Sequence, residues 1–427
     1  MTDLIAGHDI CVAGRHDNRS TPGRAGPGGG RPVNPARVPG EGVAMSGDVS
    51  REPRVPDDAS VPSGDANDWW IYRGAGGVSA TPLADLLPPP PPWRDFDGGP
   101  VIPGPAPRDD AEIHRRLGAF DAAVRTSSDE ADMVNAALFL RRPLIVTGPP
   151  GIGKSSLAHR VSRELDLGRV LRWTITSRST LKEGLYAYDA IGRVQEAAAL
   201  GALHGPAATE GRLSDKAPAA DGSPRADGAD SLQGLGDFVQ LGPLGTALVP
   251  RDTPRVLLID EFDKADTDLA NDLLGAFEDG EFHIPELSRV RSRMPEVTVH
   301  TDDPDDTFVV RSGRIRCRAF PFVVITSNGE RSLPPAFLRR CLTLEMPPPD
   351  ADRLMAMLAA QFTSGEGSER ATMIRDFLSR ALAGGTLAAD QLLNAEFLRV
   401  SPKGPDEASW NRLLHSLWRR LDEVGSA

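Results

Sequence analysis

The run of residues that most constrains this 427-residue chain is Gly148-Pro149-Pro150-Gly151-Ile152-Gly153-Lys154-Ser155. It fits the pattern G-x-x-x-x-G-K-[ST], follows the apolar segment LIVT and precedes SLAHRVSREL, which has the apolar periodicity of a helix. This context distinguishes a phosphate-binding loop from a chance glycine-rich turn, because glycines let backbone amides at a helix N-terminus point at a phosphate. We predict that residues 148–156, Ser156 included, bind a nucleotide, with Lys154 on the β- and γ-phosphates and Ser155 on Mg²⁺.

Four apolar segments predict the strands of one parallel sheet. They cover residues 144–148, 170–176, 256–260 and 322–328, and helical periodicity lies between them. Alternating buried strands and helices are typical of an α/β domain whose sheet is flanked by helices. We predict such a core over 110–346, followed over 347–427 by a small all-α domain with at least four helical segments.

Two carboxylates end the segment VLLIDE, at Asp260 and Glu261. Ligands of parallel sheets bind at the C-terminal edge of the strands, so these side chains are expected beside the phosphate loop. There, Asp260 is suited to hold Mg²⁺ through water, and Glu261 to deprotonate the water that attacks a γ-phosphate. A pair of helix-capping acids is the alternative, which the phosphate loop upstream disfavours.

Polar residues also follow the last of these strands. Asn328 ends FVVITSN and is predicted to emerge beside Glu261, where its amide can position the attacking water; a turn-forming Asn-Gly pair is the alternative. Arg339 and Arg340 precede a further apolar segment, LTLEM. They are either a solvated pair or the source of an arginine finger that reaches the nucleotide of a neighbouring subunit.

Charge and cysteine content exclude several classes of protein. The net charge of −12 argues against a protein whose whole surface grips nucleic acid or anionic lipid. Cys11, Cys317 and Cys341 are too few and too widely spaced for a disulfide scaffold or a four-cysteine zinc site. Because no apolar run approaches a membrane span and the first residues lack a secretory pattern, we predict a soluble, cytoplasmic protein.

Composition predicts the remaining segments. Residues 1–66 are rich in glycine and proline and are predicted to be disordered, with Met45 as a second plausible start. The low-complexity stretch at about 197–233 is predicted to be a disordered loop. An aromatic and proline-rich leader at 67–109 is predicted to dock on the chain's own core, the alternative being a polyproline ligand for an SH3-type domain. The aromatic side chains expected to dock are Trp69, Trp70, Trp93 and Phe96.

The phosphate loop, VLLIDE, FVVITSN and FLRRC, followed by a helical lid, resemble an AAA+ ATPase over about residues 110–425. Leu241-Gly242-Pro243-Leu244 and DEFDKADTDLANDLLGAFEDGEFHIPE are similar to the MoxR branch. The leader and TSRSTLKEGLYAYDAIGR are similar to a bacterial subgroup encoded beside von Willebrand A-domain proteins in conflict systems. The resemblance implies ATP and Mg²⁺ as cofactors and a homo-oligomeric ring, which is expected to have six subunits. It also implies chaperone-like remodelling of a partner protein. The expected partner is a von Willebrand A-domain protein or another co-encoded protein.

The resemblance also implies roles for single residues. By the family pattern, Lys154 and Ser155 bind the nucleotide and Mg²⁺, and Asp260 supports the metal ion. In the same pattern Glu261 is the catalytic base and Asn328 is sensor 1. Arg340 is the expected arginine finger, and Arg339 is the alternative. The lid departs from the family pattern, because residues 386–391 read TLAADQ where a basic sensor-2 residue is usual. Arg380 is the neighbouring basic residue that can substitute.

A basic segment precedes the Asn328 strand. Ser312-Gly313 is predicted to form a hairpin turn, after which Arg314, Arg316 and Arg318 alternate and are predicted to face one side of a strand. The resemblance implies that this hairpin faces the pore of a ring, where it can grip an acidic peptide or a nucleic acid; a solvated strand face explains the same pattern. Two other functions stay open. One is a nucleic-acid-dependent motor, against which the net charge counts, and the other is a non-hydrolysing nucleotide switch.

Overall fold

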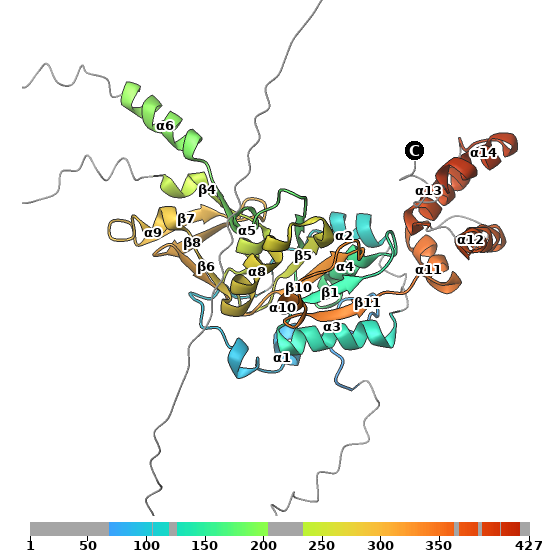
Figure 1. The fold of residues 1–427 in the computed structure, drawn as a ribbon, viewed down its shortest axis with the longest axis horizontal. Helices are drawn as coiled ribbons and strands as arrows, with labels where there is room; N and C mark the ends of the chain where they lie inside the picture. The colour runs from blue at the N-terminus through green and yellow to red at the C-terminus, as the bar shows by residue number, and fades with distance from the viewer. Residues whose placement is uncertain are drawn as a thin grey trace, which may run out of the picture. The chain divides into compact units, whose positions relative to one another are not determined.

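The computed structural model describes residues 68–104, 106–118, 126–203, 234–362, 367–382, 387–401 and 403–418 (Figure 1). The predictions for residues 1–66, including Met45 and Cys11, lie outside these ranges. So does the part of the predicted loop from 204 to 233.

A five-stranded sheet, all of it parallel, forms the centre of the α/β domain. Its strand order is β11-β1-β10-β5-β2. The bounds are Leu144–Thr147 for β1, Leu171–Thr174 for β2, Val256–Asp260 for β5, Phe322–Ser327 for β10 and Leu342–Glu345 for β11. The α/β fold class predicted from the four apolar segments is confirmed, and LTLEM forms the fifth strand.

The two faces of this sheet bury two separate apolar cores. Successive side chains of a strand point to opposite faces, so Ile325 joins one core and Val324 the other. The helices α3 (Ser128–Leu140) and α4 (Lys154–Glu164) cover the face of Val324, and α8 (Thr267–Asp279) covers the face of Ile325. Burial on both faces explains why the strands read as continuous apolar runs rather than as alternating ones.

A second sheet of six strands, mostly antiparallel, packs into the core on the α8 side. Its order is β3-β4-β7-β8-β9-β6. The bounds are Tyr186–Tyr188 for β3, Val239–Leu241 for β4, Glu281–His283 for β6, Glu296–His300 for β7, Thr307–Arg311 for β8 and Arg314–Arg316 for β9. The sequence patterns predicted one hairpin of this sheet, without the sheet itself.

The predicted hairpin joins β8 to β9. Ser312 and Gly313 have φ angles of 52° and 71°, and two positive φ angles are typical of a two-residue hairpin turn. The prediction that three arginines alternate along one strand is wrong, because β9 ends at Arg316. Arg314 and Arg316 both pair with a carboxylate of β6, whereas Arg318 lies beyond the strand and donates to the Phe96 carbonyl oxygen (3.1 Å).

The leader lies against the core through its first aromatic cluster. Tyr72 is fully buried, and the Asn135 side chain on α3 accepts from the Tyr72 amide (2.9 Å) and donates to its carbonyl oxygen (2.8 Å). Further along, the leader contains α1 (Leu83–Leu86) and the short helix η1 (Pro92–Arg94). Trp93 contradicts the docking prediction, since it is 73% exposed. The η1 turn directs Arg94 and Phe96 inward and leaves Trp93 facing solvent.

Short helices connect these sheets. Their bounds are Leu181–Leu185 for α5, Pro243–Ala247 for α7, Phe262–Lys264 for η6, Pro285–Ser288 for α9 and Pro335–Leu338 for α10. The helix α6 (Ala190–Leu203) extends from the second sheet in Figure 1. It corrects the predicted loop, whose residues 197–203 are helical, and the alanines and leucines of AAALGAL are strong helix formers.

The described residues after the α/β domain form four helices: α11 (Ala351–Gln361), α12 (Gly367–Leu382), α13 (Ala389–Val400) and α14 (Glu407–Leu417). Leu354 and Leu358 are buried in a core of their own, and Met357 packs against it. These helices provide the lid of the predicted fold class.

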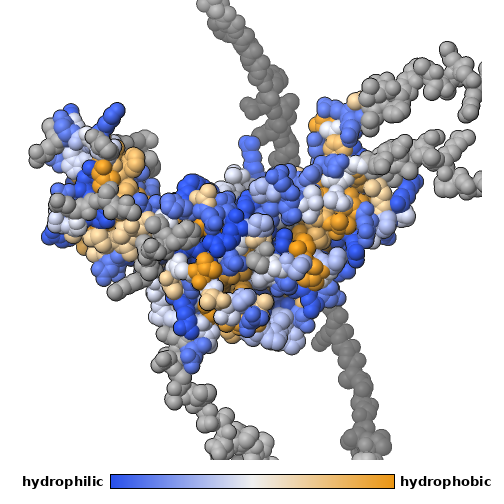
Figure 2. All heavy atoms as spheres, turned by 180° about the vertical axis from the view of Figure 1, so that it is seen from behind, coloured by the Kyte–Doolittle hydropathy of each residue, from blue (hydrophilic) through white to orange (hydrophobic). Residues whose placement is uncertain are grey.

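The surface of the described residues is mixed. In Figure 2 hydrophilic residues cover most of the visible face, and smaller hydrophobic patches lie between them. Within the described ranges, no helix has both the length and the apolar composition that crossing a bilayer requires.

Candidate nucleotide site

The phosphate loop has a backbone that side chains would disrupt. Gly148, Gly151 and Gly153 have φ angles of 141°, 74° and 90°. A Cβ at Gly148 would lie 2.5 Å from the Met346 carbonyl oxygen, and one at Gly151 would lie 2.4 Å from the Ala388 Cβ of the lid. Glycine is therefore required both for the left-handed turns and for the close approach of neighbouring segments. The helix α4 begins directly after the loop, at Lys154.

The Lys154 side chain is buried and satisfied by three oxygens. Its Nζ donates to the carbonyl oxygens of Gly148 (2.7 Å) and Pro149 (2.8 Å), and to Oδ1 of Asn328 (2.8 Å). Burial lowers the pKa of Lys154, while Asp263 and Asp260 oppose that shift. The last polar residue of the β10 segment is thus tied directly to the lysine of the phosphate loop.

Asp260 is the most heavily hydrogen-bonded carboxylate of the site. Its Oδ1 accepts from the hydroxyls of Ser155 and Thr326, each at 2.7 Å, and its Oδ2 accepts from Nη2 of Arg172 at 2.7 Å. Burial by itself raises the pKa of Asp260, but these hydrogen bonds outweigh burial and hold the pKa below its usual value. The carboxylate is therefore ionised and oriented by three elements, α4, β10 and β2.

Glu261 lies at the start of η6 with a φ of 62°, and its amide donates to Thr326 Oγ1 (2.9 Å). Its carboxylate pairs with the Lys264 ammonium at 2.7 Å, and the side chain is 43% exposed. Glu261 and Asn328 line the same cleft. Neighbouring strands β5 and β10 thus place the two side chains together, as their positions in the sequence predict.

Sequence reasoning missed two residues that hold this edge of the sheet in place. Asp263 is 2% exposed, and its Oδ2 accepts from the backbone amides of Asn328 (3.1 Å) and Glu330 (3.4 Å). Arg172 lies within the apolar segment VLRWTIT, where a charged residue indicates a charged partner nearby. Asp263 and Arg172 thus orient Asn328 and Asp260, although the sequence patterns gave neither of them a role.

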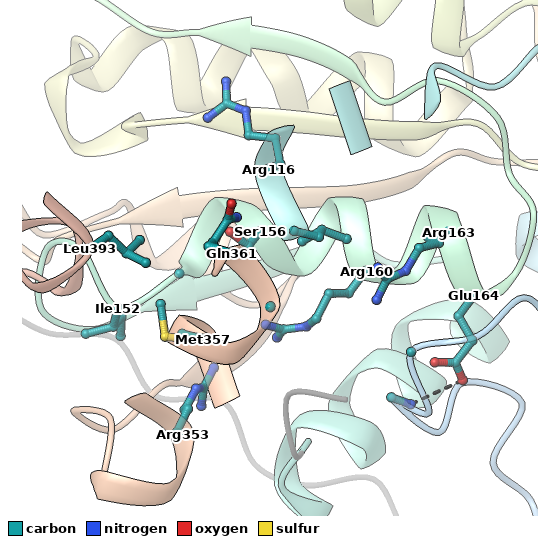
Figure 3. Close-up of a pocket in the computed structure, with 15 residues that line it drawn as sticks. Arg116, Ile152, Ser156, Arg160, Arg163, Glu164, Arg353, Met357, Gln361 and Leu393 are labelled. Carbon is teal, nitrogen blue, oxygen red and sulfur yellow. Dashed lines mark hydrogen bonds between the residues drawn. The ribbon is translucent and has the colours of Figure 1, made fainter. Parts of the chain in front are cut away.

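The cleft has a volume of about 1020 Å³ and contains the phosphate loop, Asp260, Glu261 and Asn328 on the side of the core. Lid residues and the helix α2 (Asp110–Leu117) complete its lining. A second, much smaller pocket of about 70 Å³ lies beside it, between α4 and α11 (Figure 3). Arg160 and Arg163 from α4 and Arg353 from α11 line that pocket, together with apolar Ile152 and Met357.

The predicted finger residues lie away from this cleft. Arg340 pairs with Glu278 at the end of α8, and it donates to the Ala336 carbonyl oxygen (3.1 Å). Neither Arg340 nor Arg339 lines the cleft of its own chain. In the lid, the Arg380 guanidinium lies 4.9 Å from the centre of the Trp418 ring, and this residue does not line the cleft.

The oxygen donors of the site fit Mg²⁺. The Ser155 hydroxyl and the Asp260 carboxylate are in direct contact, and Mg²⁺ takes hard oxygen ligands of these two kinds together with phosphate oxygens. Among the described residues no group of three or more His, Cys, Asp or Glu side chains could hold a metal by itself.

Comparison with known proteins finds a family model that overlaps this site. Residues 143–341 match the model of the AAA domain (dynein-related subfamily), a stretch of less than half the chain. No protein of curated function matches the sequence. The structure of C. elegans PCH-2 is similar at 14% identity and a TM-score of 0.33, over 72% of this chain and 70% of that one. NtrX from Brucella abortus in complex with ADP is similar at 12% identity and a TM-score of 0.33, over 70% of this chain and 57% of that one. Residues 143–341 are therefore similar to the AAA domain, and they contain the parallel sheet flanked by helices.

Proposed function

We propose that this chain is a Mg²⁺-dependent ATPase of the MoxR type that works as a homo-oligomeric ring, with six subunits expected, and remodels a partner protein. The observation that carries the proposal is the contact of Ser155 with Asp260 beside the buried Lys154, at the mouth of a glycine-rich loop. A loop with this geometry at a helix N-terminus suits the phosphates of a nucleotide. The cleft around it holds the further polar side chains that hydrolysis needs.

Each side chain has a role in the proposed reaction. Lys154 binds the β- and γ-phosphates, and the oxygens of Ser155 and Asp260 hold the metal ion. Bound Mg²⁺ supplies positive charge that offsets the negative charge of the phosphates. Asn328 orients the attacking water, and Glu261 takes its proton. Glu261 leaves Lys264 for this step, and because the pair is exposed its loss costs only about 0–1 kcal/mol.

The place of the arginines supports the proposal of a ring. Because Arg340 and Arg339 lie outside the cleft of their own chain, a finger role for either requires a second subunit. An arginine finger is worth about 10³–10⁵ in rate for enzymes of this chemistry. The partner, expected to be a von Willebrand A-domain or other co-encoded protein, is proposed from the sequence resemblance.

The role of Glu261 is tested by Glu261→Gln. This variant should bind ATP as the wild type does, because the amide has the same shape, while ATP turnover falls to background. Asp268→Asn changes an exposed carboxylate of α8 and should leave turnover unchanged. Turnover at the wild-type rate in Glu261→Gln would contradict the assignment of the base.

Ring formation is tested by measuring ATPase activity per subunit against protein concentration. Activity should rise with concentration in the wild type and in Arg339→Ala, and should fall at least about 1000-fold in Arg340→Ala. If activity per subunit is the same at every concentration, the site is complete within one chain. A loss in Arg339→Ala with a normal Arg340→Ala would assign the finger to Arg339.

A further inference from the structure

The described part of the lid brings no positive charge to the cleft. Among the described lid residues that line it, Asp390 is the one charged side chain. The position that the sequence offered as a substitute, Arg380, is packed on Trp418 instead. Ala388 lies against Gly151 of the phosphate loop, so the N-terminus of α13 covers the loop with small apolar residues. A positive charge facing the phosphates must therefore come from another element.

The helix α2 presents two arginines to this cleft. Arg115 and Arg116 line it together with Lys154, and these three are the cations of its described lining. Asp109 caps α2 by accepting from the Glu112 amide (2.9 Å), and the helix packs along α4, whose first turn carries Lys154. In Figure 3 Arg116 stands on α2, next to α4. The two arginines thus lie on an ordered helix beside the phosphate loop.

Both arginines are held by one carboxylate. Arg116 Nε donates to Oε1 of Glu112 (2.8 Å), and Arg115 Nε donates to Oε2 (2.7 Å). Burial raises the pKa of Glu112, but its hydrogen bonds with Arg116 and Arg115 outweigh this and bring the pKa to about 2. Within the described residues, the Nη1 and Nη2 groups of Arg116 have no hydrogen-bond partner, so these donors are available to an incoming anion.

The charged side chains that line the cleft determine how Arg115 and Arg116 affect nucleotide binding. Asp260, Glu261 and Asp390 line it with three carboxylates. Arg172 pairs with Asp260 and Lys264 pairs with Glu261, so Lys154 and the α2 pair are the cations of the described lining that can face an incoming polyphosphate. Glu112 offsets one of the two arginine charges, so the α2 pair with its carboxylate adds one net positive charge to the cleft, before any metal ion is counted.

We propose that Arg115 and Arg116 contact the phosphates of the nucleotide from within the same chain, and that they provide the positive charge absent from the described part of the lid. The inference rests on the proposed nucleotide function. Arg116 is the principal contact, because it is 27% exposed and its terminal nitrogens are unpartnered within the described residues, whereas Arg115 is 66% exposed. The contact favours a triphosphate over a diphosphate, since the third phosphate adds charge on the open side of the loop.

The test is direct titration of the full chain with fluorescent N-methylanthraniloyl ATP and ADP in the presence of Mg²⁺. In Arg116→Ala and in the double variant Arg115→Ala/Arg116→Ala, affinity for the ATP analogue should fall at least about tenfold, and for the ADP analogue less than about threefold. Arg375→Ala, an exposed arginine of α12, should match the wild type for both nucleotides.

A conservative variant separates charge from packing. Arg116→Lys keeps the charge and the apolar stem and should recover most of the preference for the ATP analogue, whereas Arg116→Gln should not. If the wild type binds both nucleotides and every α2 variant binds them equally well, the inference is wrong while the proposed nucleotide site stands. If the wild type binds neither nucleotide, the proposed function itself fails.

Discussion

Glu130 lies where four segments of the described chain meet, and replacing it should strongly destabilise the protein. The residue is 2% exposed in the first turn of α3. Its Oε1 accepts from Nη2 of Arg160 on α4 (2.6 Å) and from the Tyr72 hydroxyl of the leader (3.3 Å). Its Oε2 lies 3.7 Å from Nη2 of Arg353 on the lid helix α11. One carboxylate thus balances two guanidinium groups that are largely removed from water.

The magnitude follows from this burial. Removing one partner of a buried ion pair costs about 3–5 kcal/mol, because the remaining charge stays without compensation in a low-dielectric environment. Glu130→Ala should therefore lower the free energy of unfolding by about 3–5 kcal/mol, a large part of the 5–15 kcal/mol that is typical of a folded domain. The neighbouring Asp129 is exposed, so Asp129→Ala should cost less than about 1 kcal/mol.

Unfolding in guanidinium chloride, followed by circular dichroism, measures these differences, provided that the slope with denaturant is unchanged. Replacing the charged pair together, in Glu130→Leu/Arg160→Met, should cost less than Glu130→Ala, because no buried charge of that pair is left alone. A loss below about 1 kcal/mol in Glu130→Ala would refute the reasoning. So would a double variant that is as unstable as the sum of its two single variants.

Three further predictions follow from buried groups. Burial raises the pKa of Cys317 and of Cys341 to about 12, so neither thiol should react with a thiol reagent at pH 8 until the chain unfolds. Burial lowers the pKa of His159 to about 4, so its neutral ring stabilises the fold above pH 6.5. As the pH falls from 6.5 to 4, the wild type should lose up to about 3 kcal/mol more of its free energy of unfolding than His159→Gln. Finally, Phe96→Ala should cost about 3–5 kcal/mol in denaturant unfolding, because Phe96 is 4% exposed, whereas the exposed Trp93→Ala should cost less than about 0.5 kcal/mol.

Each of these predictions has an outcome that would contradict it. Rapid labelling of both buried thiols in the native protein would contradict their burial. Cys11 is replaced by serine for this measurement, so that only the two buried thiols can react. The neutral thiols stabilise the fold below about pH 9, and that contribution is lost as the pH rises toward 12. Equal acid sensitivity of the wild type and His159→Gln would contradict the pKa of His159. An equal cost of the two aromatic replacements would show that the η1 turn does not orient the leader.

The sequence predicts the α/β domain because its signals are local. The phosphate loop is a continuous run of nine residues, and β5 and β10 are apolar runs that only burial on both faces explains. Glu261 and Asn328 directly follow these two strands along the chain, so the shared edge of a parallel sheet predicts that they lie close together. Chain order and strand pairing suffice for this much of the site.

The second sheet and the leader show where local signals end. The strands β3, β4, β6 and β9 have three residues each, too few for a period to be recognised. Composition predicts that aromatic leader residues dock, but only the turn of η1 decides that Phe96 is buried and Trp93 is not. Similarly, the predicted loop begins with residues whose helix propensity outweighs the glycine-rich composition of the stretch.

The charges of the site are decided by tertiary structure alone. Arg172 reaches Asp260 because β2 pairs with β5 in one register, and 88 residues separate the two. Asp263 reaches the amide of Asn328, which is 65 residues away. Arg116 and Lys154 share a cleft because α2 packs on α4. The sequence by itself determines which residues can carry a charge and which segments are apolar enough to be buried. The Coulomb energy between two charges depends on the distance between them, and only the folded chain sets that distance.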